Sequence, residues 1–256
     1  VASGEMREIP WPWPQLTGLT QAFAPGTVTL LCGLEGSGKS FLVVQSIVHW
    51  IREHVKVACL MLEDDERKHI YRAMAQVAKE PGLSNLHWIA DHEEHAMNVL
   101  GVHTDLMNSL GRALCAPEKP MDVAGVEAWV DGRMARGARI VAIDPLSAIT
   151  GAMEDEYRQV TDLVQRLKTL VRKHNSAVLL VVHPKKGSCL VMPGKDGKLA
   201  ERDPTMDDLQ SSKNLTKFAH VVLWLQGHPE YKDSSVSRSG APPMLEKHNR
   251  TMHILK

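Results

Sequence analysis

The chain has few cysteines, and they form no recognisable pattern. Only four of its 256 residues are cysteine, namely Cys32, Cys59, Cys115 and Cys189, and no two of them have the C-x-x-C spacing of a metal or redox site. Cys32 and Cys59 lie in apolar segments, where buried free thiols are common. The sequence therefore predicts no disulfide framework, which suits a reducing cytoplasm.

Long apolar runs and an excess of one charge are also missing. No stretch reaches the roughly 18 consecutive apolar residues of a membrane-spanning helix, and no segment is typical of a signal peptide. Lysine and arginine together number 30, as do aspartate and glutamate, so the formal net charge is zero. Any contact with nucleic acid must therefore come from local basic loops. We expect a cytoplasmic protein without a membrane partner.

A zinc-protease signature is absent at the one place where metal-ligating residue types crowd together. Residues 91–95 read D-H-E-E-H, which contains H-E-x-H. The metal-binding signature H-E-x-x-H needs one further residue to place both imidazoles on the same face of a helix. No metal site is predicted in this segment.

A complete phosphate-binding loop is present at residues 33–40. These residues match G-x-x-x-x-G-K-S and stand between a β-rich run at 27–32 and a helical pattern from 40 to about 55. The glycines let backbone N–H groups face phosphate oxygens, and the helix dipole favours the same charge. Lys39 can reach the β- and γ-phosphates, and the Ser40 hydroxyl can ligate Mg²⁺. The sequence predicts ATP and Mg²⁺ as cofactors, with contacts from Gly33, Glu35, Gly36, Ser37, Gly38, Lys39, Ser40 and Phe41.

Strand and helix patterns alternate along most of the chain. Short apolar runs without polar alternation are typical of strands covered on both faces, and apolar residues spaced three and four apart indicate helices. This alternation predicts an α/β fold with a mostly parallel, twisted sheet and helices on both faces. Expected strands are 57–62, 86–90, 139–144, 177–182, 221–225 and 252–255, and expected helices are 40–55, 65–79, 104–114, 122–136 and 154–174.

Three stretches do not follow this alternation. Residues 1–26 are interrupted by prolines, with Pro-Trp-Pro-Trp-Pro at 10–14, and we expect a strap that packs two tryptophans on the core. A polyproline ligand for another domain is the alternative. Residues 184–208 and 227–245 are expected to be long functional loops. We interpret the chain as an N-terminal strap, 1–26, and one ATPase domain, 27–256.

Hydrolysis of a bound nucleotide needs a carboxylate for the metal and a group that activates water. Asp144 ends an apolar strand at the carboxyl edge, where α/β proteins bind ligands, and is the predicted metal-side carboxylate. Pro145 and Leu146 follow it, so the base is not its neighbour. Glu63 directly follows the strand 57–62 and is the predicted base. The alternative for the acidic run 63–66 is a solvated helix start.

This arrangement resembles the RecA/DnaB superfamily over nearly the whole chain. The matching segments, in family order, are TLLCGLEGSGKS at 29–40, ACLMLEDD at 58–65, RIVAIDPLSAI at 139–149, VLLVVHPKK at 178–186 and DDLQSSKNLTKFAHVVLWL at 207–225. The N-terminal approach at 9–33 is similar to that of replicative-helicase and RepA-type plasmid-helicase ATPase domains. The resemblance implies a RecA-like fold and ATP hydrolysis, with Glu63 as catalytic base and His183 as a sensor of the γ-phosphate. A satisfied core histidine is the alternative for His183.

The same resemblance implies single-stranded DNA as a partner. The family places a DNA-facing loop where this chain has residues 184–208, and basic side chains in such a loop suit a phosphate backbone. Ordinary solvated loop charge is the alternative, because acidic residues are interspersed there. The candidate DNA contacts are Lys185, Lys186, Lys195 and Lys198, in a loop that also carries Arg202.

Hexameric members of the superfamily assemble as rings and reach a neighbour's γ-phosphate with a Lys-x-Arg pair on the last strand. Lys256 stands at the lysine position of that pair and is the predicted trans-acting cation, while the arginine position lies beyond residue 256. The run Lys247-His-Asn-Arg250 has one residue too many and is expected to precede the final strand. We interpret Lys247 and Arg250 as surface charge.

Three functions remain open at this point. The resemblance favours a hexameric ATPase that translocates on single-stranded DNA and unwinds duplex during replication. A recombinase or annealing protein of the same superfamily would form filaments instead. A nucleotide-gated regulatory or assembly protein of the KaiC type would have little contact with DNA, which the neutral net charge permits.

Overall fold

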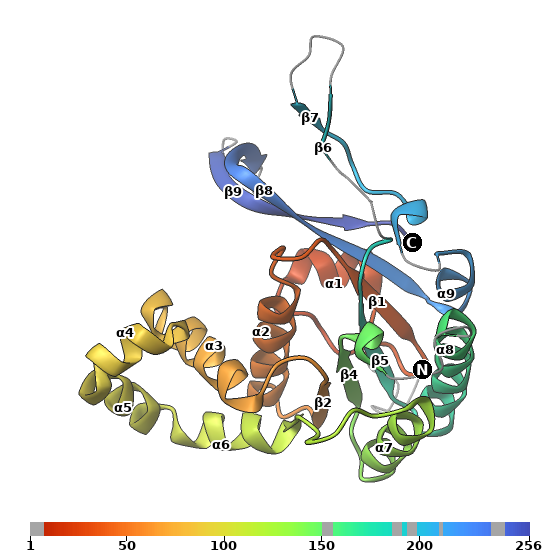
Figure 1. The fold of residues 1–256 in the computed structure, drawn as a ribbon, viewed down its shortest axis with the longest axis horizontal. Helices are drawn as coiled ribbons and strands as arrows, with labels where there is room; N and C mark the ends of the chain where they lie inside the picture. Colours follow the sequence, from red (N-terminus) through yellow and green to blue (C-terminus); the bar gives the residue numbers. More distant parts are fainter. Residues whose placement is uncertain (1–7, 150–155, 186–190, 194–198, 210–211, 237–243) are drawn as a thin grey trace.

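The computed structural model describes residues 8–149, 156–185, 191–193, 199–209, 212–236 and 244–256. They form a seven-stranded sheet in the order β3-β2-β4-β5-β1-β8-β9, flanked by helices (Figure 1). All neighbouring strands are parallel except β8 and β9, so the predicted mostly parallel sheet is confirmed. The strands are β1 (Val28–Cys32), β2 (Val57–Met61), β3 (Leu114–Cys115), β4 (Ile140–Asp144), β5 (Ala177–Val182), β8 (Val221–Val236) and β9 (Met244–Ile254).

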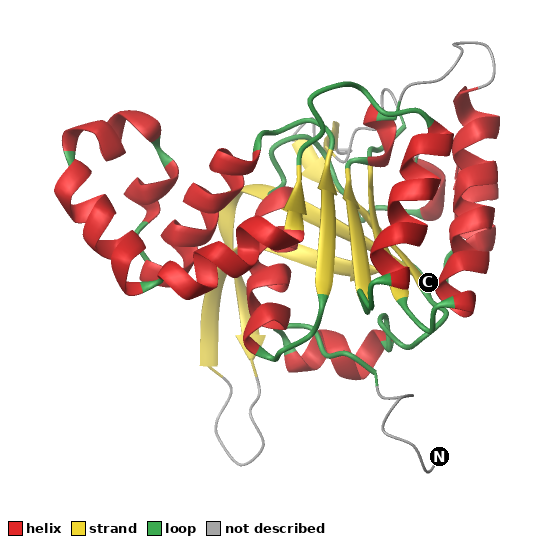
Figure 2. Ribbon diagram, turned by 90° about the horizontal axis from the view of Figure 1, so that it is seen from below, coloured by secondary structure: helices red, strands yellow, loops and turns green. Residues whose placement is uncertain are grey.

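Helices cover both faces of the sheet (Figure 2). One face packs against α1 (Pro14–Thr20), α2 (Lys39–Arg52), α3 (Glu66–Ala78) and α6 (Thr104–Ala113). The other packs against α7 (Val123–Ala135), α8 (Glu156–Lys173) and α9 (Ser212–Phe218). Every residue of β1, β4 and β5 is buried, which explains why these segments read as unbroken apolar runs. None of the described helices is long and apolar enough to cross a membrane.

The proline-rich segment packs on the core, as expected of a strap. Trp11 is 2% exposed, and its ring centroid lies 4.4 Å from that of Phe23 and 5.9 Å from that of Trp50. The indole Nε1 of Trp50 donates to the carbonyl of Pro10 at 2.8 Å, which fixes the strap on α2. Helix α1 was not predicted from the sequence. It begins at Pro14, and proline is compatible with a first helical position, whose N–H has no acceptor within the helix.

Residues 86–90, predicted as a strand, form helix α4 (Leu86–Asp91), so that prediction was wrong. The Asn85 side chain accepts hydrogen bonds from the backbone N–H groups of His87 and Trp88 and caps the helix. A five-residue apolar run does not by itself distinguish a strand from a helix. With η2 (Pro81–Ser84) and α5 (Glu93–Val102), α4 forms a helical lobe at the left of Figure 1.

Of the two predicted loops, 227–245 is largely strand in its described residues, while 184–208 contains two short strands. Residues 227–236 and 244–245 belong to β8 and β9, which continue past the sheet as an antiparallel hairpin with an irregularity between Gly227 and Lys232. The segment 184–208 contains β6 (Val191–Pro193), β7 (Leu199–Glu201) and η4 (Met206–Asp208). Strands β6 and β7 pair with each other alone and form an arm at the top of Figure 1. The Ser-, Pro- and Gly-rich composition of 227–245 suggested a loop, whereas cross-strand pairing makes its described residues strand.

We expect Trp11→Ala to lower the free energy of unfolding by about 3–5 kcal/mol, because it removes a buried ring from an aromatic cluster. Trp13→Ala is the matched control, since Trp13 is only partly buried. Urea unfolding followed by circular dichroism measures both. Equal losses from the two variants would contradict the assigned packing of the strap.

Candidate nucleotide site

The phosphate loop joins the carboxyl end of β1 to the start of α2. Gly38 is the N-cap of α2 at φ 99°, in the left-handed region that favours glycine. At Gly33 a Cβ atom would lie 2.7 Å from the Ser37 hydroxyl and would clash with the backbone of Leu225, so only glycine fits. The predicted strand–loop–helix context is present.

Lys39 lies inside this loop. Its Nζ donates to the carbonyl oxygens of Gly33 at 2.8 Å and Leu34 at 3.0 Å, and the residue is 8% exposed. Burial lowers the pKa of Lys39, while the nearby carboxylates of Asp144 and Glu63 act in the opposite direction. The ammonium is therefore held where the loop would receive the phosphates of a nucleotide.

Asp144 and Ser40 meet beside Lys39. Asp144 is 6% exposed at the end of β4, and burial raises the pKa of its carboxyl to about 6, although a hydrogen bond from Ser40 lowers it in part. Its Oδ2 is buried and has no hydrogen-bond partner among the described residues. A buried carboxylate oxygen without a partner, next to a hydroxyl, fits the oxygen ligands that Mg²⁺ prefers.

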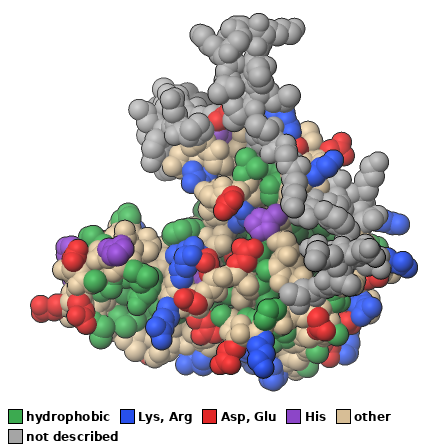
Figure 3. All heavy atoms as spheres, viewed as in Figure 1, with side chains coloured by type: hydrophobic (Ala, Val, Ile, Leu, Met, Phe, Trp, Pro, Cys, Tyr) green, Lys and Arg blue, Asp and Glu red, His purple; other side chains and the backbone are tan. Residues whose placement is uncertain are grey.

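Glu63 and His183 follow the two strands that flank β4, and their side chains lie close to each other. Strand β4 lies between β2 and β5, with Met61 opposite Asp144 and the Leu62 N–H donating to the Asp144 carbonyl at 2.8 Å. Glu63 Oε1 lies 3.6 Å from His183 Nε2. Their side chains are 57% and 31% exposed, so solvent reaches both. Acidic, basic and histidine side chains lie close together at the middle of this face in Figure 3.

The other carboxylates of the acidic run 63–66 have separate partners. Asp64 pairs with Lys68 at 2.5 Å and with Arg72 at 2.9 Å. Burial alone would raise the pKa of Asp64, but these hydrogen bonds lower it overall. Asp65 caps α3 by accepting from the Lys68 N–H, and Glu66 accepts from the Ala116 N–H at 3.2 Å. Of the carboxylates in the run 63–66, the one that contacts His183 is Glu63.

Two cations were missed or misjudged from the sequence. Arg72 lies on α3 with its Cζ 5.0 Å from the centroid of the Phe41 ring, and nothing in the sequence marked it. Arg250 lies within β9, and its Nε donates to the Ser37 carbonyl of the phosphate loop at 2.7 Å. Arg250 is exposed, as expected of surface charge, but its predicted place before the final strand was wrong, because β9 begins earlier than expected.

Lys256 has a role inside its own chain. Its Nζ donates to the carbonyl oxygens of Thr216 at 2.8 Å and Ala219 at 2.7 Å, around the C-terminal end of α9. A cation at this position satisfies carbonyls that have no partner within the helix. The structure therefore does not support the prediction that Lys256 is a trans-acting cation.

A mostly apolar cavity of about 620 Å³ opens next to the loop. It extends from Ser37 and Gly38 over Phe41 and Gln45 to the strap at Leu16 and to β9. Its volume lies within the range of small-molecule sites. The cavity can accept an uncharged, flat group attached to phosphates held in the loop.

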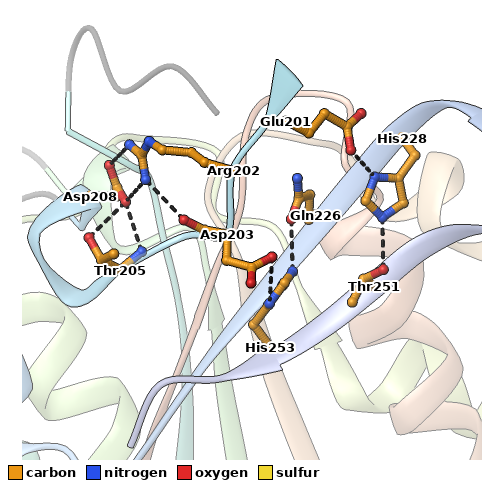
Figure 4. Close-up of polar contacts among 9 residues, drawn as sticks. All are labelled: Glu201, Arg202, Asp203, Thr205, Asp208, Gln226, His228, Thr251 and His253. Atoms are coloured by element: carbon orange, nitrogen blue, oxygen red, sulfur yellow. Dashed lines mark hydrogen bonds and ion pairs between the residues drawn. The ribbon is translucent and has the colours of Figure 1, made fainter. Parts of the chain in front are cut away.

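The predicted DNA contacts are only partly visible. Lys185 is exposed at the end of β5, while Lys186, Lys195 and Lys198 lie outside the described residues. Arg202 makes two hydrogen bonds to Asp208, at 2.5 and 2.8 Å, and chiefly through this guanidinium the pKa of Asp208 falls to about 2 (Figure 4). Arg202 thus holds the segment after β7 through Asp208.

Histidines fix this segment to the long hairpin (Figure 4). His228 on β8 contacts Glu201 of β7 through Nδ1 at 2.8 Å and Thr251 of β9 through Nε2 at 2.7 Å. His253 Nε2 lies 2.8 Å from Gln226 Oε1 on the neighbouring strand. The base of the arm is therefore joined to β8 and β9, and Thr251 is adjacent to Arg250.

Comparisons with known proteins agree with this geometry. The family described as AAA domain matches residues 3–188. A DnaB-like replicative helicase, whose structure was described with its interactions with primase, superposes with a TM-score of 0.67 at 16% identity, over 88% of this chain and 52% of that one. The chain thus spans about half the length of that helicase. A second solved structure, that of a single ATPase domain, superposes with a TM-score of 0.65 at 16% identity, over 96% of this chain and 89% of that one.

No curated protein matches the chain. The structural similarities show the fold: a RecA-like phosphate-loop domain, as in the ATPase domains of DnaB type. The sequence-based resemblance to the RecA/DnaB superfamily is confirmed at this level.

We expect Asp144→Asn to stabilise the protein in the absence of Mg²⁺ and nucleotide at pH 8. The pKa of Asp144 is raised from 3.8 to about 6, so the folded state favours the protonated form and stability falls as pH rises from about 4 to 6. An uncharged amide avoids this cost, which amounts to about 3 kcal/mol above pH 6. Urea unfolding from pH 4 to 8 measures it. Exposed Asp162→Asn is the control, and a pH-independent difference from wild type would contradict the argument.

Proposed function

Because this chain belongs to the AAA domain family, we propose that it binds and hydrolyses Mg²⁺-ATP at the carboxyl edge of its sheet. One observation carries the proposal. Glu63, Asp144 and His183 lie at the carboxyl ends of three neighbouring parallel strands, where Glu63 contacts His183, and Asp144 and Glu63 act on Lys39 of the phosphate loop. A chance loop motif would not bring these side chains together.

Each residue has a distinct task in this reaction. The loop N–H groups and Lys39 bind the phosphates, and Ser40 and Asp144 would hold the metal, which neutralises charge that develops on the phosphoryl oxygens. Glu63 is accessible to water and accepts its proton as the water attacks the γ-phosphate. The cavity beside Ser37 receives the base and ribose.

His183 links the state of the γ-phosphate to the base. It lies 3.6 Å from Glu63, so a histidine that donates to a phosphate oxygen also fixes the position of the carboxylate. We assign it the role of γ-phosphate sensor. Arg250 contributes from β9, because its guanidinium already contacts the loop at Ser37.

We further propose that the ATPase acts as a helicase or translocase on single-stranded DNA in replication, as a hexamer. Support comes from the fold shared with a DnaB-like replicative helicase and with the second ATPase domain. The arm of β6 and β7 follows the sensor strand β5, and exposed Lys185 stands between them. A recombinase and a KaiC-like regulator remain the alternatives.

We expect Glu63→Gln to bind ATP normally but to turn it over at least ~10²-fold more slowly, because the cradle stays intact while the proton acceptor is lost. Asp64→Asn is the matched control, since Asp64 pairs with Lys68 and Arg72. Lys39→Ala should instead abolish nucleotide binding at the phosphate loop. Titration with a fluorescent ATP analogue and a phosphate-release assay separate the three variants. Wild-type turnover in Glu63→Gln would refute the assignment of the base.

DNA binding is expected to weaken steeply with salt, because the loop lysines release counterions from DNA phosphates. Replacing Lys185, Lys186, Lys195 and Lys198 by Gln should flatten this dependence and lower DNA-stimulated ATP hydrolysis together. Fluorescence anisotropy with labelled oligothymidylate at several salt concentrations measures it. Unchanged DNA binding, combined with full ATPase activity, would favour the regulatory alternative.

A further inference from the structure

A second pocket lies at the opposite edge of the sheet from the phosphate loop. Its volume is about 410 Å³, and it opens where β2 and β4 begin, between α6 and α7. Four cations line it: Lys56, Arg112, Arg133 and Arg136. We call it the amino-edge pocket. The proposed ATPase uses none of these residues.

The four cations come from three separate elements. Lys56 directly precedes β2, Arg112 lies in the last turn of α6, and Arg133 and Arg136 lie at the end of α7. A basic residue in the last turn of a helix offsets the helix dipole, which accounts for one cation at each of two helix ends. It does not account for the convergence of all four on one pocket.

These cations also lack acidic partners. No Asp or Glu is among the described residues that line the pocket, and none of the four cations forms an ion pair within the described part of the chain. On the neighbouring surface of α7 and α8, by contrast, Lys173 pairs with Asp131 at 2.9 Å. In a chain of zero net charge, four clustered cations without a carboxylate are an uncompensated local charge.

Arg133 is held in a fixed position at the wall of this pocket. Its Nε is buried and has no hydrogen-bond partner among the residues that the structure describes. Its guanidinium lies over the ring of Trp129, with Cζ 5.0 Å from the ring centroid, so the side chain is held in place. The ring fixes the guanidinium beside the pocket, so this cation needs little reorganisation to meet an anion there.

We propose that the amino-edge pocket binds the phosphate groups of a nucleotide. A carboxylate has two oxygens and one charge and is satisfied by a single guanidinium, whereas adjacent phosphates offer more oxygens and charges to several cations at once. Ile51, Val55 and Val57 form an apolar part of the wall, on which a sugar or base can rest. The source is either a free nucleoside polyphosphate or one segment of a nucleic-acid strand, since both present the same chemistry.

The test uses the whole chain with Lys39→Ala, which removes the phosphate-loop site. Isothermal titration calorimetry in EDTA at about 50 mM salt measures binding of tripolyphosphate, ATP and oligothymidylate. We expect one tripolyphosphate site whose affinity falls at least ~10-fold when Arg112, Arg133 and Arg136 are all replaced by Gln. The control triple Lys79→Gln, Lys119→Gln and Arg158→Gln removes the same charge elsewhere and should leave the affinity unchanged.

The source is identified by which ligand binds more tightly than tripolyphosphate: ATP indicates a free nucleotide, and oligothymidylate indicates a strand. An equal loss of tripolyphosphate affinity in the two triple variants would overturn the proposal. So would the absence of tripolyphosphate binding in the Lys39→Ala parent and in its variants. Equal binding of polyglutamate with the same residue dependence would overturn the preference for phosphate. If circular dichroism shows that the triple variant of the pocket residues is unfolded, the single variant Arg136→Glu replaces it. Arg136 is exposed, so this variant should fold, and its negative charge should reduce the affinity for tripolyphosphate. Failure of Lys39→Ala to reduce ATP binding would count against the proposed ATPase and not against this pocket.

Discussion

The parallel pairing of β4 between β2 and β5 is the constraint on which the site depends. Parallel strands place all their carboxyl ends at one edge, and the register sets Met61 opposite Asp144. Glu63, Asp144 and His183 therefore meet although they are far apart in the sequence. The register is itself fixed by burial, because these strands are covered on both faces and cannot slip without exposing apolar side chains.

Burial also sets the electrostatics of this edge. Asp144 and Lys39 are both withdrawn from water, and each loses part of its preference for the charged form. Burial disfavours the charged form of the Asp144 carboxyl, and a bound metal would favour that form again. Glu63 and His183 remain open to solvent, which suits groups that must meet water and phosphate. The site thus combines a buried part that binds with an accessible part that reacts.

The hairpin of β8 and β9 connects this site to distant parts of the fold. Arg250 contacts the phosphate loop at Ser37, and the next residue, Thr251, contacts His228, which in turn contacts Glu201 at the base of the arm. These hydrogen bonds, together with the covalent link between Arg250 and Thr251, connect the nucleotide edge to β7. The amino-edge pocket lies outside this connection, at the far ends of β2 and β4.

The sequence by itself determined the nucleotide loop, the alternation of strands and helices, and the side chains that end β2, β4 and β5. These features are local, because a motif of eight residues or an apolar period carries its own physical signal. Tertiary structure decided how each carboxylate of the acidic run is engaged, since Asp64, Asp65 and Glu66 acquire other partners while Glu63 contacts His183. It also brought Arg250 to the loop and placed Lys256 on the carbonyls at the end of α9. The contacts of Arg250 and Lys256 join residues far apart in the sequence, and no local pattern encodes them, whereas the helix caps at Asp65 and Asn85 are local signals.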